Sequence, residues 1–306
     1  MGSAVDSLRI GFIGAGQLAT PLAWSLARAG YAIVGATSRS QASAARLAAG
    51  IAGAKVYGGP QQLADDADLV VIAVPDDAIA TVAKSVRWHA RHSVVHCSGA
   101  TEVSSLAPAA AAGASTGGFH PLQSFTDTGA AMKSLPGCTV GIEAEGPLLA
   151  VLTAMAEALG CHPIRLPAGA RALYHASGSF ASSFLVGLLN DALALWAAFG
   201  VDREEAFRAL LPLVKGTLAT IEANGPIQSL AGPIARGDVA TVERHIVALR
   251  SEAPALLPTY LDIARRSLAI AEAKGGAEKA KLDALGALLD RSSGEPSNLR
   301  RRDPPE

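Results

Sequence analysis

Short, continuous apolar runs recur through the first half of the chain, separated by stretches of mixed polarity. Four of them are typical of strands buried on both faces of a parallel sheet and cover residues 10–13, 31–37, 68–74 and 93–97. Two further runs, at 139–142 and 161–166, flank a helical stretch over 147–159 that starts at Pro147. Because strands alternate with helices, the pattern predicts an α/β fold with a doubly wound parallel sheet.

Helical periodicity replaces the strand pattern after residue 166. The predicted helices cover residues 172–199, 203–224, 238–248, 253–274 and 278–289. The remaining segment, 292–306, is rich in Pro, Ser, Gly and charge, which is typical of disorder. We therefore predict a sheet domain over 1–166, an all-α domain over 167–291 and a disordered tail over 292–306.

The longest apolar stretch lies in the first of these helices, between Phe180 and Val201. Asn190 and Asp191 interrupt it. Polar residues at such positions are costly in lipid, so we interpret the stretch as a buried helix and not as a membrane span.

The first predicted strand ends in a glycine-rich turn. Gly14 permits a tight turn, Gly16 leaves room for a pyrophosphate beside the backbone, and Ala19 lets the next helix pack closely. The amino terminus of that helix would present free N–H groups to phosphate. Pro21 removes one donor, which is tolerable in the first turn. An ordinary strand-to-helix turn is the alternative. We predict a dinucleotide site that includes Gly14, Ala15, Gly16, Gln17 and Leu18.

The second predicted strand ends at Ser38-Arg39-Ser40, where an NAD site usually has a carboxylate. An arginine flanked by hydroxyl groups suits the 2′-phosphate of NADP(H), although a solvated turn arginine would look the same. The third strand ends at Val74 and Pro75, where the cofactor would lie. Asp76 or Asp77, which follow, are expected to cap the next helix.

Candidate catalytic groups lie in the segments that follow the later strands. His120 and Gln123 belong to a polar and aromatic loop over 118–125, and Ser98 follows the strand at 93–97. His120 titrates near neutrality when unperturbed and is the first choice for proton transfer, but a structural role in the loop fits equally well. Ser98 and Gln123 could donate hydrogen bonds to a substrate carbonyl. Ser98 could equally hold a turn.

A polar stripe on the long helix supplies further candidates. His175 and Ser179 lie one turn apart, and Ser182 or Ser183 lies one turn further on. A dimer interface would explain the stripe as well as a substrate cleft would. We predict that His175 helps to orient substrate and that Ser179 and Ser183 contact it. Arg236 could bind a substrate carboxylate, pair with Asp238 or cap a helix.

Composition narrows the class of protein. The 306 residues carry a net charge of −1 and 5% aromatic residues, which argues against nucleic acid or an anionic membrane as a partner. Cys97, Cys138 and Cys161 show no paired spacing, which favours a reducing, cytoplasmic location, and the last two are expected to be small buried apolar residues. No basic segment followed by an apolar core marks a secretory signal in residues 1–7. Histidine spacing predicts no metal site.

The motifs together resemble a family of bacterial two-domain Rossmann-like oxidoreductases whose helical C-terminal half was long regarded as a domain of unknown function. The resemblance lies in the glycine turn, His96-Cys97-Ser98-Gly99, Gly118 to Phe125 and Gly232 to Asp238. The wider superfamily includes 6-phosphogluconate dehydrogenase, ketopantoate reductase, pyrroline-5-carboxylate reductase and F420-dependent NADP oxidoreductase. The resemblance implies an NADP(H) domain and a helical domain that binds substrate and forms a homodimer. Ser183, where relatives are expected to have asparagine, and Ser229-Leu230-Ala231 depart from the family pattern.

The sequence therefore predicts an NADP(H)-dependent oxidoreductase that reduces or oxidises a small carbonyl compound at an interdomain cleft. The resemblance makes a 2-oxo acid such as ketopantoate the leading substrate. An imine reductase of the pyrroline-5-carboxylate type is one alternative. A protein that binds NADP(H) without turnover, as a sensor or scaffold, is another.

Overall fold

The computed structural model describes residues 8–125 and 128–293. The described residues form two compact units, which divide between Phe184 and Leu185. The division therefore falls after the boundary expected near 166, because the helix that starts at Arg171 packs with the sheet unit. Residues 294–306 of the predicted tail lie outside the described residues, whereas Ser292 and Ser293 still belong to the last helix.

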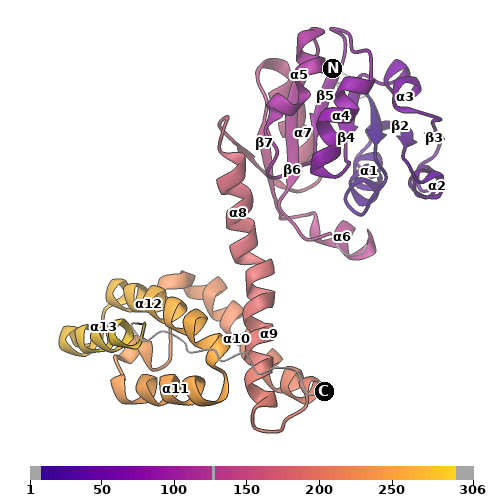
Figure 1. The fold of residues 1–306 in the computed structure, drawn as a ribbon. Helices are drawn as coiled ribbons and strands as arrows, with labels where there is room; N and C mark the ends of the chain where they lie inside the picture. The colour runs from indigo at the N-terminus through magenta and orange to yellow at the C-terminus, as the bar shows by residue number, and fades with distance from the viewer. Residues whose placement is uncertain (1–7, 126–127, 294–306) are drawn as a thin grey trace, which may run out of the picture. The chain divides into compact units, whose positions relative to one another are not determined.

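The first unit is built on one mixed sheet (Figure 1), whose strand order is β3-β2-β1-β4-β5-β6-β7-β8. The strands are β1 (Arg9–Ile13), β2 (Ala32–Thr37), β3 (Lys55–Val56), β4 (Leu69–Ile72), β5 (Ser93–His96), β6 (Ser115–Pro121), β7 (Thr139–Glu143) and β8 (His162–Arg165). Strand order reverses between β1 and β4, which is the switch point of a doubly wound sheet. The predicted fold class is confirmed.

Two details of the sheet differ from the prediction. β7 pairs antiparallel with β6 and parallel with β8, so the sheet is only mostly parallel. Strand β6 covers residues 115–121 and so includes the first part of the loop expected over 118–125. Gly117 and Gly118 obscured this strand, because glycine weakens the sequence signal of a strand. In the structure they leave room for close neighbours, which are Ala144 at Gly117 and Arg171 at Gly118.

Helices cover both faces of the sheet. They are α1 (Ala19–Arg28), α2 (Gln41–Ala49), α3 (Pro60–Asp66), α4 (Asp76–Ser85), α5 (Ala107–Ala111), α6 (Thr128–Ser134), α7 (Gly146–Ala158) and α8 (Arg171–Ala181), with a 3-10 turn, η1 (Val103–Leu106). One apolar core joins the sheet to α1, α2 and α7 through Phe12, Leu22 and Leu152. A second core joins the other face to α3, α4 and α5 through Leu63 and Ile79.

The second unit contains helices, as predicted. They are α9 (Ser183–Ala197), which begins just before the boundary, α10 (Arg203–Ser229), α11 (Val239–Glu252), α12 (Leu257–Lys274) and α13 (Lys279–Ser293), with 3-10 turns η2 (Ile234–Arg236) and η3 (Pro254–Leu256). Its core packs α11, α12 and α13 through Val242, Leu261 and Leu285. Asp202 caps α10 by accepting from the backbone N–H groups of Glu204 and Glu205.

The predicted burial of the long apolar helix is wrong. Among the described residues, Arg171–Ala197 is long and apolar enough to cross a membrane by length and composition alone, with a mean hydropathy of 1.4, but only 6% of that window is buried. Phe180, Phe184 and Val186 keep 63%, 51% and 68% of their surface exposed. Apolar periodicity shows that a helix face needs a partner, and it does not show that the partner is part of the same chain.

Candidate functional site

The carboxyl ends of four neighbouring parallel strands meet at one edge of the sheet. β1, β4, β5 and β6 are adjacent in the strand order and run in the same direction. Their ends bring together the Gly14 turn, the Val74-Pro75 segment, the Ser98 turn and His120. Ligands of open α/β sheets bind at this kind of edge, beside the switch point.

The turn after β1 has the geometry that the glycine motif predicts. Gly14 has φ of +106°, and a Cβ there would lie 2.1 Å from the carbonyl oxygen of Ala73, so only glycine fits. A Cβ on Gly16 would meet no described atom within 4 Å, so the backbone there is open to a ligand. Ala15 is buried, and Gln17 is exposed. Leu18 precedes α1 at the N-cap position and supplies no side-chain cap.

These features fit the pyrophosphate of a dinucleotide. The first N–H groups of α1 receive no side-chain acceptor at the cap, and the motif leaves space beside Gly16. Pro21 is the third residue of α1, within the first turn, and the helical hydrogen bonds of Thr20 to Gly16 and of Leu22 to Leu18 form on either side of its missing N–H.

The segment after β2 is arranged around a helix cap. Ser40 caps α2, because its Oγ accepts from the N–H of Ser43 at 3.2 Å, and the N–H of Ser40 donates to Ser38 Oγ at 3.4 Å. Arg39 between them is exposed and has no ion-pair or hydrogen-bond partner among the described residues. Its guanidinium is therefore available to a phosphate group.

The start of α4 corrects one prediction. Val74 is half-buried after β4, and Pro75 is the exposed N-cap residue of α4. Neither Asp76 nor Asp77 caps the helix through its side chain. Asp76 instead accepts a hydrogen bond from Ser98 Oγ at 2.8 Å and so connects the turns after β4 and β5.

Ser98 is held at the centre of a hydrogen-bond network. Its hydroxyl donates to Asp76 and accepts from the N–H groups of Ala100 and Thr101, at 3.3 and 2.9 Å. Its own N–H donates to His96 Nδ1. A hydroxyl group can donate one hydrogen bond, and Ser98 donates it to Asp76. This geometry favours a role for Ser98 in positioning the turn over direct donation to a substrate.

Arg171 completes this network and was missed by sequence reasoning. Its fully buried guanidinium donates to the Glu143 carboxylate through Nε and to the Ser98 carbonyl through Nη1, at 2.6 Å. Its Nη2 packs where a Cβ of Gly118 would stand and has no partner among the described residues. The absence of a side chain at Gly118 leaves the space that this guanidinium fills.

His120 lies between Tyr174 and His175. Tyr174 Oη is 3.1 Å from His120 Nδ1, and the rings meet edge to face with centroids 5.5 Å apart. The His175 ring centroid lies 5.8 Å from that of His120. A Cβ on Gly99 would stand 2.8 Å from His120 Nε2 and 2.4 Å from His175 Cδ2, so glycine at 99 lets both rings pack against this turn.

Burial fixes the charge of these rings. Desolvation, with smaller contributions from the charges of His175 and Arg171, lowers the pKa of His120 to about 4. Desolvation likewise lowers the pKa of His96 to about 4 and raises the pKa of Tyr174 to about 12. All three groups are therefore neutral near pH 7. His120 offers a neutral imidazole with one N–H donor and one acceptor nitrogen.

Most of the predicted catalytic and substrate residues line one hollow of about 600 Å³. It is formed wholly by residues of the first unit, among them His120, Gln123, His175, Ser179 and Ser183. The Gln123 side chain is engaged locally, because its Oε1 accepts from the N–H of Ser124 at 2.8 Å. His175 is exposed and carries its ring into the hollow without a described hydrogen bond.

Arg236 belongs to the second unit. It ends η2, and its side chain is exposed. Asp238, two residues later, caps α11 by accepting from the N–H of Thr241 at 3.1 Å. The contribution of Arg236 to substrate binding therefore stays a prediction.

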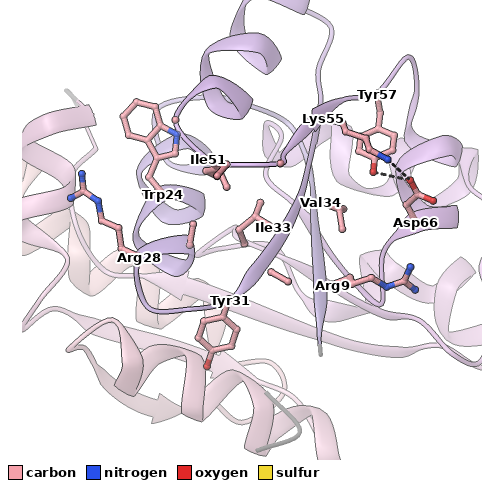
Figure 2. Close-up of a pocket in the computed structure, with 15 residues that line it drawn as sticks. Arg9, Trp24, Arg28, Tyr31, Ile33, Val34, Ile51, Lys55, Tyr57 and Asp66 are labelled. Atoms are coloured by element: carbon pink, nitrogen blue, oxygen red, sulfur yellow. Dashed lines mark hydrogen bonds and ion pairs between the residues drawn. The ribbon is translucent and has the colours of Figure 1, made fainter. Parts of the chain in front are cut away.

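A separate hollow of about 690 Å³ lies at the other end of the strands (Figure 2). Trp24 and Arg28 of α1 line one side, and Tyr57 and Asp66 line the other, joined by a hydrogen bond of 2.9 Å. Its strand residues include Arg9 and Ala32, the first residues of β1 and β2. This hollow is therefore at the edge opposite to the Gly14 turn.

Two family models match the chain. A Rossmann-like domain matches residues 3–121, and a domain of unknown function, DUF2520, matches residues 138–267. The chain therefore contains a Rossmann-like domain followed by a DUF2520 region. The DUF2520 match starts at Cys138, so this region of the family includes β7 and β8 of the sheet as well as helices. No curated protein matches the chain.

Solved structures with the same fold cover almost the whole chain. A Thermotoga maritima protein is 25% identical, with a TM-score of 0.71 over 87% of this chain and 99% of its own. A candidate NADP oxidoreductase from Bacteroides fragilis is 23% identical, with a TM-score of 0.67 over 86% and 99%. A reductive aminase from Aspergillus terreus, solved with NADPH and ethyl-5-oxohexanoate, is 18% identical, with a TM-score of 0.63 over 93% and 99%.

The buried histidines make stability depend on pH. His96 and His120 have a folded pKa of about 4 against 6.5 for the free side chain, so the unfolded chain binds more protons between these values. Stability should be full above pH 6.5 and fall as pH drops toward 4, by at most about 3 kcal/mol per histidine. Urea unfolding at pH 7, 6 and 5 measures this loss.

The variants H96Q and H120Q serve as controls for this prediction. Each should show a smaller loss between pH 7 and 5 than the wild-type chain, because one titrating group is removed. A wild-type free energy of unfolding that is constant from pH 7 to 5 would contradict the burial of the two neutral rings.

Proposed function

We propose that this chain is an NADP(H)-dependent oxidoreductase that acts on a small carbonyl compound or on the imine derived from one. The observation that carries the proposal is the hollow of about 600 Å³ that contains His120, at the same sheet edge as the Gly14 turn. Solved structures of the same fold support it: a reductive aminase with NADPH, an imine reductase with NADPH4 and a pyrroline carboxylate reductase with NADP.

Different residues at the sheet edge would bind different parts of NADP(H). The turn over 14–18 and the first N–H groups of α1 would hold the pyrophosphate, and Arg39 would hold the 2′-phosphate. Val74 and Pro75 would lie against the cofactor after β4. NADPH bound there supplies the hydride.

His120 would handle the proton on the substrate side. Tyr174 Oη lies 3.1 Å from Nδ1 and 3.3 Å from the His120 carbonyl oxygen, and its one proton can serve either acceptor. In the tautomer in which it donates to Nδ1, Nε2 carries the ring proton on the side of the ring that faces the Gly99 turn. A neutral imidazole can then donate this N–H to a carbonyl oxygen, as fits its lowered pKa. Asp76, Ser98 and Arg171 hold the turn around it.

The substrate divides the proposal into two arms. A 2-oxo acid such as ketopantoate remains the leading substrate of the carbonyl arm. The imine arm is favoured by the relatives named as imine reductases and reductive aminases. Steady-state NADPH consumption with ketopantoate and with pyrroline-5-carboxylate, assayed side by side, separates the two arms.

The first prediction of the proposal concerns cofactor choice. NADPH should bind at least about tenfold more tightly than NADH, and R39S should remove most of this preference, because a charged hydrogen bond to phosphate contributes about 1.5–3 kcal/mol. Fluorescence titration of the nicotinamide and thermal shift measure both affinities.

Two variants separate the parts of the cofactor site. G16A should weaken NADPH and NADH alike without lowering the melting temperature, because the added methyl group meets only open space in the protein. R28S is the matched control, since Arg28 is an exposed arginine that lines the opposite hollow. Absence of binding by either nucleotide would overturn the proposal.

The second prediction concerns proton transfer. H120A should lower kcat by about two orders of magnitude, as expected for loss of a general acid. Wild-type kcat should stay constant from pH 6 to 8, because the pKa of His120 lies near 4. The measurement is the pH profile of NADPH oxidation with the better of the two substrates.

The chain offers a matched control for this variant. His245 Nδ1 lies 2.9 Å from Tyr260 Oη, with an edge-to-face ring pair like that of His120 and Tyr174, and it does not line the hollow. H245A should leave kcat unchanged. Equal kcat values for H120A and wild type would remove His120 from the chemistry, and tight NADPH binding without turnover of any carbonyl or imine would favour a sensor.

The exposed apolar surface of α8 and α9 supports a homodimer. We propose that a second copy of the chain covers Phe180, Phe184 and Val186, which are more than half exposed. Light scattering coupled to gel filtration should give twice the mass of one chain, and F184E/V186E should give one. V247E, at an equally exposed apolar position of α11, should remain a dimer. A monomeric wild type, or its partition onto lipid vesicles, would contradict this assignment.

A further inference from the structure

Two cysteines that are far apart in the sequence meet inside the first unit. Cys138 directly precedes β7, and Cys161 directly precedes β8. These strands are parallel and place Thr139 opposite His162, so the two cysteines lie opposite each other one step earlier. Their sulfur atoms are 3.6 Å apart, and both residues are buried and free.

The backbone at this pair already has the spacing of a disulfide. Neighbouring strands lie about 4.8 Å apart, and the Cα atoms of disulfides are usually about 4.4–6.8 Å apart. Closing the bond therefore needs side-chain rotation and no displacement of either strand.

We propose that Cys138 and Cys161 form a redox-active dithiol, which hydrogen peroxide converts into a disulfide between β7 and β8. This assignment is independent of the proposed function, because it needs neither a bound nucleotide nor a substrate. The oxidant is hydrogen peroxide, which is small enough to reach two buried thiols that larger oxidants cannot contact.

The two sulfur atoms have different roles in this reaction. The Cys161 thiol lies within hydrogen-bonding distance of Cys138 Sγ and of the Leu135 carbonyl oxygen, at 3.6 and 3.1 Å. The hydrogen bond between the thiols lowers the pKa of Cys138 and raises that of Cys161. Cys138 is therefore the group that attacks peroxide, and Cys161 is the group that resolves the product.

The reaction balances with peroxide as the only oxidant. The Cys138 thiolate attacks one peroxide oxygen, the O–O bond breaks, and hydroxide leaves to take up a proton as water. Cys161 sulfur then attacks the sulfur of the resulting sulfenic acid, the S–S bond forms and the S–O bond breaks, and the hydroxyl group leaves with the Cys161 thiol proton as a second water. Two thiols and one peroxide thus give one disulfide and two waters.

The cross-link would lie next to the candidate site. Thr139 follows Cys138, and its carbonyl oxygen accepts the N–H of Leu122 at 2.8 Å. Leu122 lines the hollow that contains His120. A small thiol reductant would reverse the bond.

The test counts thiols on the intact chain. The protein is treated with hydrogen peroxide, unfolded in an alkylating reagent and weighed by mass spectrometry. The untreated chain should carry three alkylated cysteines and the oxidised chain one. Without alkylation, the oxidised chain should be about 2 Da lighter, since two hydrogens are lost. Dithiothreitol should restore all three thiols.

Three single variants make the result specific. C97A should still lose two thiols, because burial raises the pKa of Cys97 to about 12 and leaves that thiol inert. C138A and C161A should each form no intramolecular disulfide. Three free thiols after peroxide treatment of the wild type, oxidation confined to Cys97, or oxygen addition to Cys138 that dithiothreitol does not reverse would each overturn the proposal.

Discussion

The candidate site depends on one buried cation. The guanidinium of Arg171 has no exposed surface, and it joins the Glu143 carboxylate at the end of β7 to the Ser98 carbonyl in the turn after β5. Removing one partner of a buried ion pair costs about 3–5 kcal/mol, because the other charge stays buried. The same contact fixes the first turn of α8, and α8 carries Tyr174 and His175 to His120.

The titratable rings near Arg171 are uncharged and interact through hydrogen bonds. His96, His120 and Tyr174 are neutral near pH 7, because burial disfavours their charged forms. The carboxylate of Asp76 accepts a hydrogen bond from the Ser98 hydroxyl and so orients the turn. The site therefore offers oriented N–H and O–H groups beside a hollow, an arrangement that suits a substrate whose charge changes only at one oxygen or nitrogen atom.

Features of the fold and site that depend on local residue types could be predicted from the sequence, and features that depend on distant contacts could not. The turn at Gly14 and the buried strands follow from residue types that permit few alternatives, and both were predicted. Strand β6 was not, because Gly117 and Gly118 give a loop-like pattern. Arg171 could not be found, since its burial depends on contacts with residues distant in sequence, and the meeting of Cys138 with Cys161 depends on the register of β7 and β8. Whether His120 is catalytic stays a prediction.

The reversal of direction at β7 limits where new specificity can arise. Because β7 is antiparallel to β6 and parallel to β8, the carboxyl ends of these last two strands point to the edge opposite the Gly14 turn. The connection after β7 therefore lies away from the Gly14 turn, whereas the connection after β8 leads into α8, which brings Arg171, Tyr174 and His175 back to the candidate site. Divergence in substrate range within such a scaffold must come from the turns after β4 and β5, the segment after β6, and the exposed face of α8.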